Sequence, residues 1–527
     1  MGCNSSKLEI AKSSVNIQNE PEDFVEGVVC KINDINENEM KTVELDEKKI
    51  LLVKQNGKIS ALGTKCTHYG APLVNGALGD GRIRCQWHGA CFSLATGDIE
   101  DFPGLDSLPC YKVTIDNDNV KVRARKSELV SNKRIKHMAQ KLSSESKKIV
   151  IIGGGPAGAT CVEALRQEGF QGGITMVCRE RYLPYDRVKV SKAMDFEIEK
   201  AQLRDDKFYK EHNIDILKGI EATGVDTGTK TVSLSNGNHI QYDKLFIATG
   251  CKPRKLDVPG CNLKNVLVLR DYDDSQYAIS QINDQADVVV IGSSFIGMEA
   301  ANYCVDKVKS VTVIGRDSAP FKSIWGEQIG VAILKLFESK GVKFIPHSGI
   351  KKINDNGEGA ISSVELKDGQ ILKADILFMG TGSTYYTDFL KGSGVELRPD
   401  AYSPVWSHHN NKVAIGHYPL AHYHGKMAAL NILGKQTPIK SVPYFWTMLF
   451  GKGFRYAGHG KYDDIIFAGD VDSLKFMAFF LKDDEVVSTA SCGMDPLVSQ
   501  FAERLAQGRK LYRKDIQDDP LAWSKTV

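Results

Sequence analysis

Two segments of the chain share one pattern of apolar and polar positions. Each begins with a short apolar run, passes through a glycine- or serine-rich turn into a helix-length stretch, and ends in a second apolar run. The segments are "KKIVIIGGGPAGATCVEALRQEGFQGGITMVCRE" (147–180) and "ADVVVIGSSFIGMEAANYCVDKVKSVTVIGRD" (286–317). Short apolar runs bounded by turn residues predict buried strands, so each segment predicts a strand–turn–helix–strand unit with parallel strands.

Other segments follow different patterns. Residues 123–148 are polar, basic and nearly free of large apolar side chains, which predicts a solvated linker. Residues 463–492 alternate with a period of two, which predicts strands of a small sheet and places Ala468, Gly469 and Asp470 inside a strand. The most apolar stretch, "LKFMAFFL", has the length of a strand, and no run is long enough to span a bilayer as a helix.

Length and composition limit the function classes. A chain of 527 residues is too long for one core, so several domains are expected. A net charge of +3 is too small to indicate nucleic-acid binding. The 12 cysteines do not form the dense framework of a secreted protein, and no apolar signal segment is present, so a reducing compartment is expected.

The first residues, "MGCNSS", match the pattern for N-terminal acylation. Gly2 follows the initiator, Ser6 supplies the expected hydroxyl, and Cys3 is a site for a second acyl chain. One myristoyl chain binds a membrane only marginally, so a stable tether needs both. The alternative is an unmodified, flexible tail.

Two cysteine–histidine clusters lie before the first glycine-rich turn. Cys66 and His68 form one cluster, and Cys85 and His88 form the other. Two thiolates and two imidazoles from two loops are the ligand set of a Rieske [2Fe–2S] centre, with two cysteines on one iron and two histidines on the other. The alternative is a structural Cys₂His₂ zinc site, although each loop here mixes the two ligand types.

Residues 66–109 resemble the Rieske ferredoxin family. High-potential members carry a second cysteine in each loop, where this chain has Ala71 and Trp87, and two hydroxyl donors, where it has Ala90 and Phe92. Fewer hydrogen bonds stabilise the reduced, more negative cluster less. A low-potential centre, near the bottom of a range of roughly −150 to +300 mV, is therefore expected.

The first glycine turn predicts a dinucleotide site. Its glycines fit G-x-G-x-x-G and let a pyrophosphate approach a helix N-terminus, and Glu180 ends the second strand, where a carboxylate holds a ribose hydroxyl. The second turn has serine in the middle position. The acidic residue expected after its last strand is replaced by Gly315, with Arg316 beside it, which leaves NADH or NADPH open. The turn residues are Gly153, Gly155, Pro156, Ala157 and Gly158 in the first unit and Gly292, Ser294 and Gly297 in the second.

Two such turns with "LFIATGCKPR" between them, which contains Thr249 and Gly250, resemble the two-dinucleotide flavoproteins. That resemblance implies FAD at the first turn and NAD(P)H at the second. The segment "LPYDRVKVSK" narrows it to the ferredoxin-reductase and apoptosis-inducing-factor branch, which implies that Arg187 and Lys192 lie along the flavin and that Lys192 pairs with Glu299. A cation there favours the reduced, anionic flavin.

The order Rieske domain, linker and flavoprotein resembles the apoptosis-inducing factor 3-like family over nearly the whole chain. It implies an all-β Rieske domain, two α/β Rossmann-like dinucleotide-binding domains and an α+β interface domain over the flavin. Trp446 is expected near the flavin edge, with a core position as the alternative. The expected boundaries are 1–22 (tail), 23–122 (Rieske), 123–146 (linker), 147–264 with 384–436 (FAD), 265–383 (NAD(P)) and 437–527 (interface).

The chain departs from the family pattern near residues 402–403. Flavoproteins of this class return to the FAD domain through an apolar strand that ends in Gly-Asp, whose aspartate holds the flavin's ribityl chain. No such strand is present, so an unpaired sheet edge and weaker flavin binding are expected. Five histidines crowd this region and are expected to be surface residues rather than metal ligands: His408, His409, His417, His422 and His424.

The predicted function is an oxidoreductase in which NAD(P)H reduces FAD and the flavin passes single electrons to the Rieske cluster and an unknown acceptor. Lys192 and Glu299 are the predicted catalytic residues. The alternative is a signalling or scaffold protein with little turnover, because the Gly-Asp strand is missing. A cytoplasmic, membrane-associated location is expected from acylation, and the family resemblance adds the mitochondrion.

Overall fold

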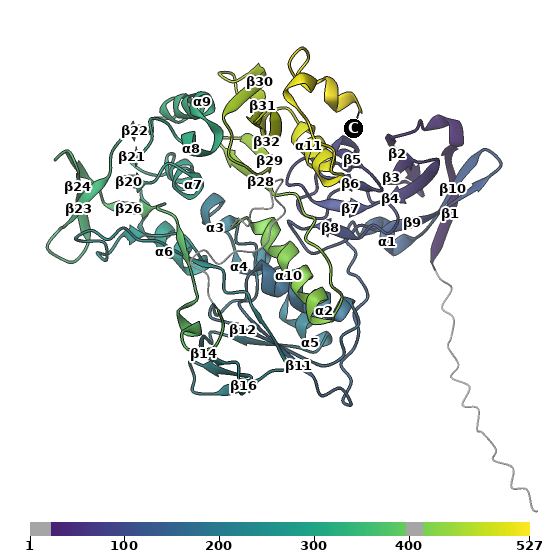
Figure 1. Ribbon diagram of the computed structural model, residues 1–527, viewed down its shortest axis with the longest axis horizontal. Coiled ribbons are helices and arrows are strands. Elements are labelled where there is room, and N and C mark those ends of the chain that lie inside the picture. The colour runs from purple at the N-terminus through teal and green to yellow at the C-terminus, as the bar shows by residue number, and fades with distance from the viewer. Residues whose placement is uncertain (1–22, 397–414, 527) are drawn as a thin grey trace, which may run out of the picture.

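The computed structural model describes residues 23–396 and 415–526. Figure 1 shows four parts, here called the N-terminal β domain, the first α/β domain, the second α/β domain and the C-terminal domain. The C-terminal domain lies between the N-terminal β domain and the second α/β domain, and the first α/β domain lies below them in this view. The predicted acylation sites, Gly2 and Cys3, are outside the described residues.

The N-terminal β domain consists of two antiparallel sheets. Six strands pair in the order β1-β10-β9-β4-β3-β2, and four short strands pair in the order β5-β6-β7-β8. Alternate residues of β10, namely Val120, Val122 and Ala124, are buried, because one face of the larger sheet covers the core. The strands are β1 (Phe24–Lys31), β2 (Glu39–Leu45), β3 (Lys48–Gln55), β4 (Lys58–Leu62), β5 (Ala77–Gly79), β6 (Arg82–Arg84), β7 (Cys91–Ser93), β8 (Ile99–Asp101), β9 (Cys110–Asp116) and β10 (Asn119–Arg125).

The stretch predicted as a solvated linker is packed against both neighbouring domains. β10 runs into it, and α1 (Lys126–Val130) follows. Arg134 pairs with Asp98 at 2.5 Å, and Met138 is 4% exposed within the core of the first α/β domain. The prediction of a solvated linker is therefore wrong at Arg134 and Met138, whereas Val130, Ile135 and Leu142 are exposed as in a linker.

The first α/β domain is built on a parallel sheet in the order β13-β12-β11-β17. The helix α2 connects β11 to β12, as the apolar pattern predicts, and α10 returns late in the chain to pack on α2. The elements are β11 (Lys148–Ile152), α2 (Pro156–Gln167), β12 (Gly173–Cys178), α3 (Lys189–Lys192), α4 (Ile198–Ala201), α5 (Asp206–Glu211), β13 (Ile214–Lys218), β14 (Ala222–Asp226), β15 (Thr231–Leu234), β16 (His239–Gln241), β17 (Lys244–Ile247), β18 (Cys251–Pro253) and α10 (Tyr418–Ile432).

The second α/β domain has the same plan with one more strand. Its parallel sheet has the order β19-β26-β20-β21-β22, and α7 connects β20 to β21. The elements are β19 (Val266–Leu267), α6 (Tyr272–Gln281), β20 (Asp287–Ile291), α7 (Phe295–Cys304), β21 (Ser310–Ile314), α8 (Lys322–Trp325), α9 (Glu327–Glu338), β22 (Lys343–Ile345), β23 (Ile350–Asp355), β24 (Ile361–Leu366), β25 (Ile371–Lys373), β26 (Ile376–Met379) and β27 (Ser383–Tyr385).

The two parallel sheets differ at one edge. In the second α/β domain β19 covers the outer edge of β26, whereas within the described residues no strand covers the outer edge of β17. The residues of β17 are exposed or half-buried. The predicted missing strand near 402–403 lies outside the described residues, so its absence stays a prediction.

The C-terminal domain is an antiparallel sheet in the order β28-β29-β32-β31-β30 with one helix, α11. One face of the sheet joins the core of the second α/β domain, and the other face packs against α11. Because both faces are covered, β31 is apolar almost throughout. The elements are β28 (Tyr444–Leu449), β29 (Lys452–Gly458), β30 (Asp464–Asp470), β31 (Lys475–Lys482), β32 (Glu485–Cys492) and α11 (Leu497–Ala506).

The prediction that these histidines lie at the surface is wrong for His422, and His417 and His424 are half-buried rather than exposed. His422 is 0% exposed on α10, and its Nδ1 lies 2.7 Å from the Thr160 hydroxyl of α2. The helix pair α10–α2 buries this face, so the surface prediction is wrong for His422. His408 and His409 are outside the described residues. Of the helices that the structure describes, none is both long and apolar enough to cross a bilayer.

Candidate functional site

The two cysteine–histidine clusters lie in two loops of the same form, one after β4 and one after β6. In the first loop the Gly70 N–H donates to the Cys66 carbonyl at 2.9 Å, and in the second the Gly89 N–H donates to the Cys85 carbonyl at 3.2 Å. Both glycines adopt positive φ, 77° and 75°, which a side chain would strain. The two turns therefore present their ligands in equivalent ways.

The loops bring the four predicted ligands together as two pairs. The thiols of Cys66 and Cys85 lie close enough to raise the pKa of Cys66, and the Nδ1 atoms of His68 and His88 lie 3.0 Å apart. Burial, with smaller effects from nearby lysines, lowers the pKa of His68 to about 3, and burial lowers the pKa of His88 well below its usual value. Both imidazoles are therefore neutral, which is the form that binds metal.

A sulfur pair beside a nitrogen pair fits a [2Fe–2S] cluster with two protein ligands on each iron. Among the described residues, no set of three or more potential ligands converges on a single point.

The histidine side of the cluster site faces the other domains. The ring of Tyr69 stacks on His68 with centroids 4.0 Å apart, and its hydroxyl donates to Asp186 of the first α/β domain. The ring of His88 lies 4.0 Å from Trp446 of β28 in the C-terminal domain. The histidine pair therefore faces two other domains, although the ring of Tyr69 is 43% exposed.

Trp446 connects the cluster site to the two residues predicted as catalytic. The Lys192 ammonium lies 5.0 Å from the Trp446 ring centroid and forms an ion pair with Glu299. Glu299 is 3% exposed and also accepts from the hydroxyls of Ser191 at 2.5 Å and Thr447 at 2.7 Å. Three domains thus meet at one buried carboxylate, and the structure brings together the predicted Lys192 and Glu299.

The first glycine turn fits a bound pyrophosphate. A Cβ at Gly153 would lie 2.3 Å from a backbone oxygen, and one at Gly158 would lie 2.0 Å from another, so both positions require glycine. A Cβ at Gly155 would meet nothing within 4 Å, so this backbone borders open space. Pro156 and Ala157 begin α2, whose N-terminus favours an anion at that place.

The remaining residues predicted at the first turn lie around it. Glu180 accepts from Arg187 Nη2 at 2.6 Å and from the Tyr185 hydroxyl at 2.6 Å. Arg187 therefore forms an ion pair with Glu180, the residue predicted to hold the ribose. The Thr249 hydroxyl donates to a backbone oxygen at 2.8 Å, and Gly250 has a φ of 64°.

The second glycine turn repeats the first. A Cβ at Gly292 would lie 2.3 Å from a backbone oxygen, and one at Gly297 would lie 1.9 Å from the Gly292 oxygen. Ser294 precedes α7 as its N-terminal flanking residue with extended backbone. The serine in the middle position therefore leaves the turn intact.

Gly315 and Arg316 follow β21 beside this turn. A Cβ at Gly315 would lie 2.5 Å from the ring of Phe344 and 3.0 Å from the hydroxyl oxygen of Ser293, which belongs to the turn. Arg316 is exposed and makes no hydrogen bond or ion pair with another described residue. The end of β21 thus presents a free cation where the family pattern has a carboxylate.

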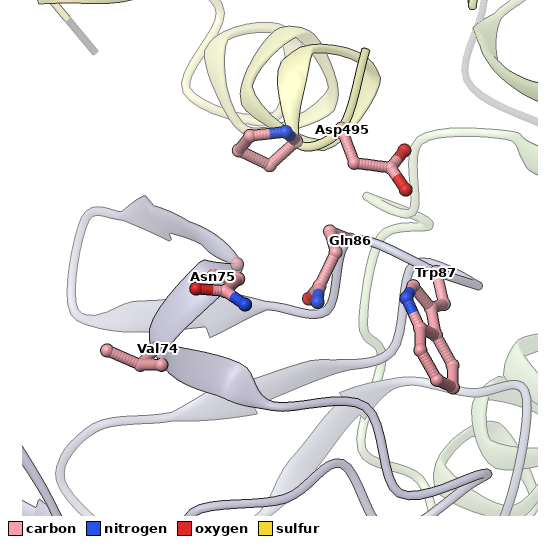
Figure 2. Close-up of a pocket in the computed structure, with 7 residues that line it drawn as sticks. Val74, Asn75, Gln86, Trp87 and Asp495 are labelled. Atoms are coloured by element: carbon pink, nitrogen blue, oxygen red, sulfur yellow. The ribbon is translucent and has the colours of Figure 1, made fainter. Parts of the chain in front are cut away.

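A cavity of about 550 Å³ borders the second ligand loop (Figure 2). Gln86 is 4% exposed, and its Oε1 has no partner among the described residues. Trp87 is 37% exposed, and its backbone N–H donates to the Cys85 sulfur at 3.4 Å. The residues that line the cavity are Val74, Asn75, Gly76, Gln86, Trp87, Asp495 and Pro496.

Sequence reasoning did not find three residues of the site. Tyr69 and Asp186 form a contact between domains, and Glu503 of α11 pairs with arginines next to the second ligand loop. Asp186 lies in the "LPYDRVKVSK" segment and Tyr69 follows a predicted ligand, but nothing in the sequence links them. Glu503 lies on a short amphipathic helix with no motif.

The comparisons agree with this geometry. Residues 26–112 match the family model described as the Rieske [2Fe-2S] domain, and residues 147–413 match that of the pyridine nucleotide-disulphide oxidoreductases. The chain is 40% identical to apoptosis-inducing factor 3 of Homo sapiens over 526 residues, 94% of this chain and 86% of that protein. It is 30% identical to a ferredoxin–NAD(+) reductase subunit of a benzene 1,2-dioxygenase system from Pseudomonas putida, over 59% of this chain and 80% of that one.

Solved structures support the fold of the flavoprotein part. A ferredoxin reductase from Rhodopseudomonas palustris matches with a TM-score of 0.68 at 22% identity, covering 72% of this chain and 100% of that one. The covalent putidaredoxin reductase–putidaredoxin complex matches with a TM-score of 0.68 at 22% identity, covering 72% of this chain and 98% of the matched chain.

Fold and site define a flavoprotein oxidoreductase with an N-terminal Rieske centre. The chain belongs to the apoptosis-inducing factor 3 family, within the pyridine nucleotide-disulphide oxidoreductases. Its cofactors are the [2Fe–2S] cluster, FAD and NAD(P)H, and the Rieske match favours iron–sulfur over zinc.

Proposed function

We propose that this oxidoreductase moves electrons from NAD(P)H through FAD to its own Rieske cluster. The observation that carries the proposal is the continuous contact from Lys192 through Trp446 to His88, with separations of 5.0 Å and 4.0 Å. Bound FAD supplies the link between the two-electron chemistry of a nicotinamide hydride and the one-electron chemistry of the cluster.

The residues of the chain have distinct tasks in this proposal. Lys192 provides positive charge beside the flavin position that the family resemblance implies, and Glu299 holds that lysine in place. Trp446 and Tyr69 pack on the rings of His88 and His68, so aromatic side chains rather than open solvent lie on the side of the cluster that faces the flavin position. The low exposure also keeps both imidazoles neutral.

We infer that NADPH is the preferred donor. Arg316 is exposed and has no partner among the described residues, at the strand end where the ribose of the second dinucleotide lies in this fold. A free guanidinium suits a 2′-phosphate, and the absence of a carboxylate at Gly315 removes the group that would repel it.

The N-terminal acylation stays part of the proposal. Acyl chains on Gly2 and Cys3 would tether the chain to a cytoplasmic membrane face, because two acyl chains bind a membrane stably whereas one binds it only marginally. The fraction of wild-type protein that sediments with cell membranes, compared with Gly2→Ala, tests this tether. Equal sedimentation of both would contradict it.

Purified protein tests the redox proposal directly. NADPH should bleach the flavin absorbance near about 450 nm, and a Rieske-type EPR signal should grow as it does so. Bleaching without any cluster signal, in protein that contains iron and acid-labile sulfide, would contradict the transfer to the cluster.

The second candidate is a signalling or scaffold protein of the same fold with weak turnover. The uncovered outer edge of β17 within the described residues favours it, because a missing strand weakens flavin binding. The amount of bound flavin per chain separates the two functions. A cluster signal in protein without flavin would favour the scaffold.

A further inference from the structure

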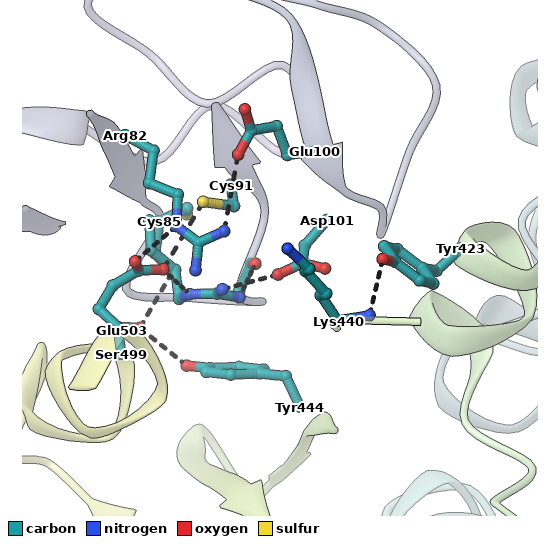
Figure 3. Close-up of polar contacts among 12 residues, drawn as sticks. Arg82, Cys85, Cys91, Glu100, Asp101, Tyr423, Lys440, Tyr444, Ser499 and Glu503 are labelled. Atoms are coloured by element: carbon teal, nitrogen blue, oxygen red, sulfur yellow. Dashed lines mark hydrogen bonds and ion pairs between the residues drawn. The ribbon is translucent and has the colours of Figure 1, made fainter. Parts of the chain in front are cut away.

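A buried ion-pair network connects the C-terminal domain to the second ligand loop (Figure 3). Arg84, the residue before Cys85, is 0% exposed. Its Nη1 donates to the carbonyl of Gly89 at 2.9 Å, and Gly89 directly follows the ligand His88. Arg84 thus spans the loop from one end to the other, with both ligands between the points that it holds.

The carboxylate that holds this arginine comes from another domain. Glu503 on α11 is 0% exposed and accepts from Arg84 Nε at 2.5 Å. Its other oxygen accepts from Arg82 Nε at 2.7 Å, while Arg84 Nη2 pairs with Asp101 at 2.6 Å. Two carboxylates thus face two guanidiniums, with Glu100 at 3.6 Å from Arg82 as a third, so the charges are compensated, and Arg84 and Glu503 are fully buried.

The same helix holds the loop at a second point. Ser499 lies one turn before Glu503 and so on the same face of α11. Its hydroxyl donates to the carbonyl of Cys85 at 3.1 Å and lies 3.1 Å from the hydroxyl of Tyr444. One helix face therefore contacts the backbone of one ligand directly and, through Arg84, the backbone next to the other.

The fit leaves little room for movement. A Cβ at Gly79 would lie 2.0 Å from a Glu503 oxygen, and one at Gly89 would lie 2.6 Å from the ring of Tyr444. Tyr444 and Trp446 lie on the same face of β28, because residues two apart in a strand do. The strand that contacts the loop at Gly89 is therefore the one that places Trp446 beside the histidine ligand.

We propose that Glu503 is a positioning residue for electron transfer between the flavin and the Rieske cluster. Through Arg84 it fixes the second ligand loop so that His88 stays against Trp446. This inference rests on the proposed function, and it assigns to α11 a task beyond the stability of the domain interface.

The test compares Glu503→Gln with Glu485→Gln in the full-length holoprotein. Glu485 belongs to the same domain and pairs with Lys510 of that domain at 2.7 Å. Three readouts are taken: the rate of cluster reduction relative to flavin bleaching after NADPH is added, the EPR g-values of the dithionite-reduced cluster, and hydrogen exchange of peptide 85–89.

For Glu503→Gln we expect unchanged cluster content and flavin bleaching, but slower cluster reduction by on the order of tenfold or more, because small misplacements cost that much. The g-values should shift and peptide 85–89 should exchange faster, while Glu485→Gln resembles the wild type. Ser499→Ala should change the same readouts in the same direction, and it serves if Glu503→Gln does not fold.

Two results would overturn the proposal. One is a variant with wild-type g-values, exchange and cluster reduction, and the other is an equal loss in Glu485→Gln. If NADPH fails to reduce the cluster of the wild-type protein, the proposed function fails, while the EPR and exchange measurements still decide whether Glu503 positions the loop.

Discussion

Replacement of Arg316 by alanine tests the donor preference most sharply. The side chain is exposed after β21 and bonds to no other described residue, so its removal breaks no internal contact. Any change in kinetics must then come from what the guanidinium does for the bound dinucleotide. NADH lacks the 2′-phosphate and serves as the internal control.

The structure sets the size of the effect. A hydrogen bond to a charged group contributes about 1.5–3 kcal/mol, and because Arg316 is exposed to solvent the lower end applies. About 1.5 kcal/mol corresponds to roughly a tenfold change in affinity. KM for NADPH should therefore rise about tenfold in Arg316→Ala, with KM for NADH nearly constant.

The reverse change is constrained by packing. A side chain at Gly315 would collide with the ring of Phe344, so Gly315→Glu alone is expected to disturb the turn, whereas Gly315→Glu with Phe344→Ala makes room for the carboxylate. This double variant should favour NADH. Stopped-flow bleaching of the flavin with each donor measures both effects, and equal changes for NADH and NADPH in Arg316→Ala would refute the reasoning.

The remaining predictions concern the cluster and its surroundings. Cys66→Ser should abolish the Rieske EPR signal and leave NADPH-dependent flavin bleaching in place; loss of both would contradict separate sites. Ala90→Ser should raise the cluster potential by about 40 mV, since one hydrogen bond adds about 1 kcal/mol, and an unchanged midpoint in a redox titration would contradict the missing-donor explanation. Tyr69→Phe removes the donor from buried Asp186 at a cost of about 1–3 kcal/mol, which should speed backbone hydrogen exchange around Tyr69 and Asp186, where the two domains meet; unchanged exchange would count against the contact. Trp87→Ala should slow reduction of added cytochrome c by the reduced cluster, because Trp87 lines the cavity through which an acceptor would approach. An unaffected rate would exclude electron exit at this cavity.

The sequence was informative wherever the chemistry depends on local spacing. The glycines of both turns were identifiable because close backbone approach and a helix N-terminus must follow within a few residues. The four residues predicted as cluster ligands stand at similarly short spacings, and the structure brings them together as two pairs. The apolar run of β31 was correctly assigned to a strand, because its length suits a strand covered on both faces.

Contacts between distant segments could not be predicted in this way. Glu503 and Arg84 are far apart in sequence, and each in isolation has the appearance of an ordinary surface charge. His422 was expected at the surface, since irregularly spaced histidines give no periodic signal, yet the packing of α10 on α2 buries it. Burial of this kind is a property of how helices meet, which no single segment specifies.

The docked position of the Rieske domain has a consequence for where electrons leave. Its histidine side packs against Tyr69 and Trp446 and so faces the flavoprotein part of the chain, although the ring of Tyr69 is itself 43% exposed. Release of the domain would break the ion pairs of Glu503 with Arg82 and Arg84 and leave that fully buried carboxylate without these partners, which is costly. The cavity beside Trp87 offers access to the ligand loop without that cost, so the acceptor is expected to approach from this side.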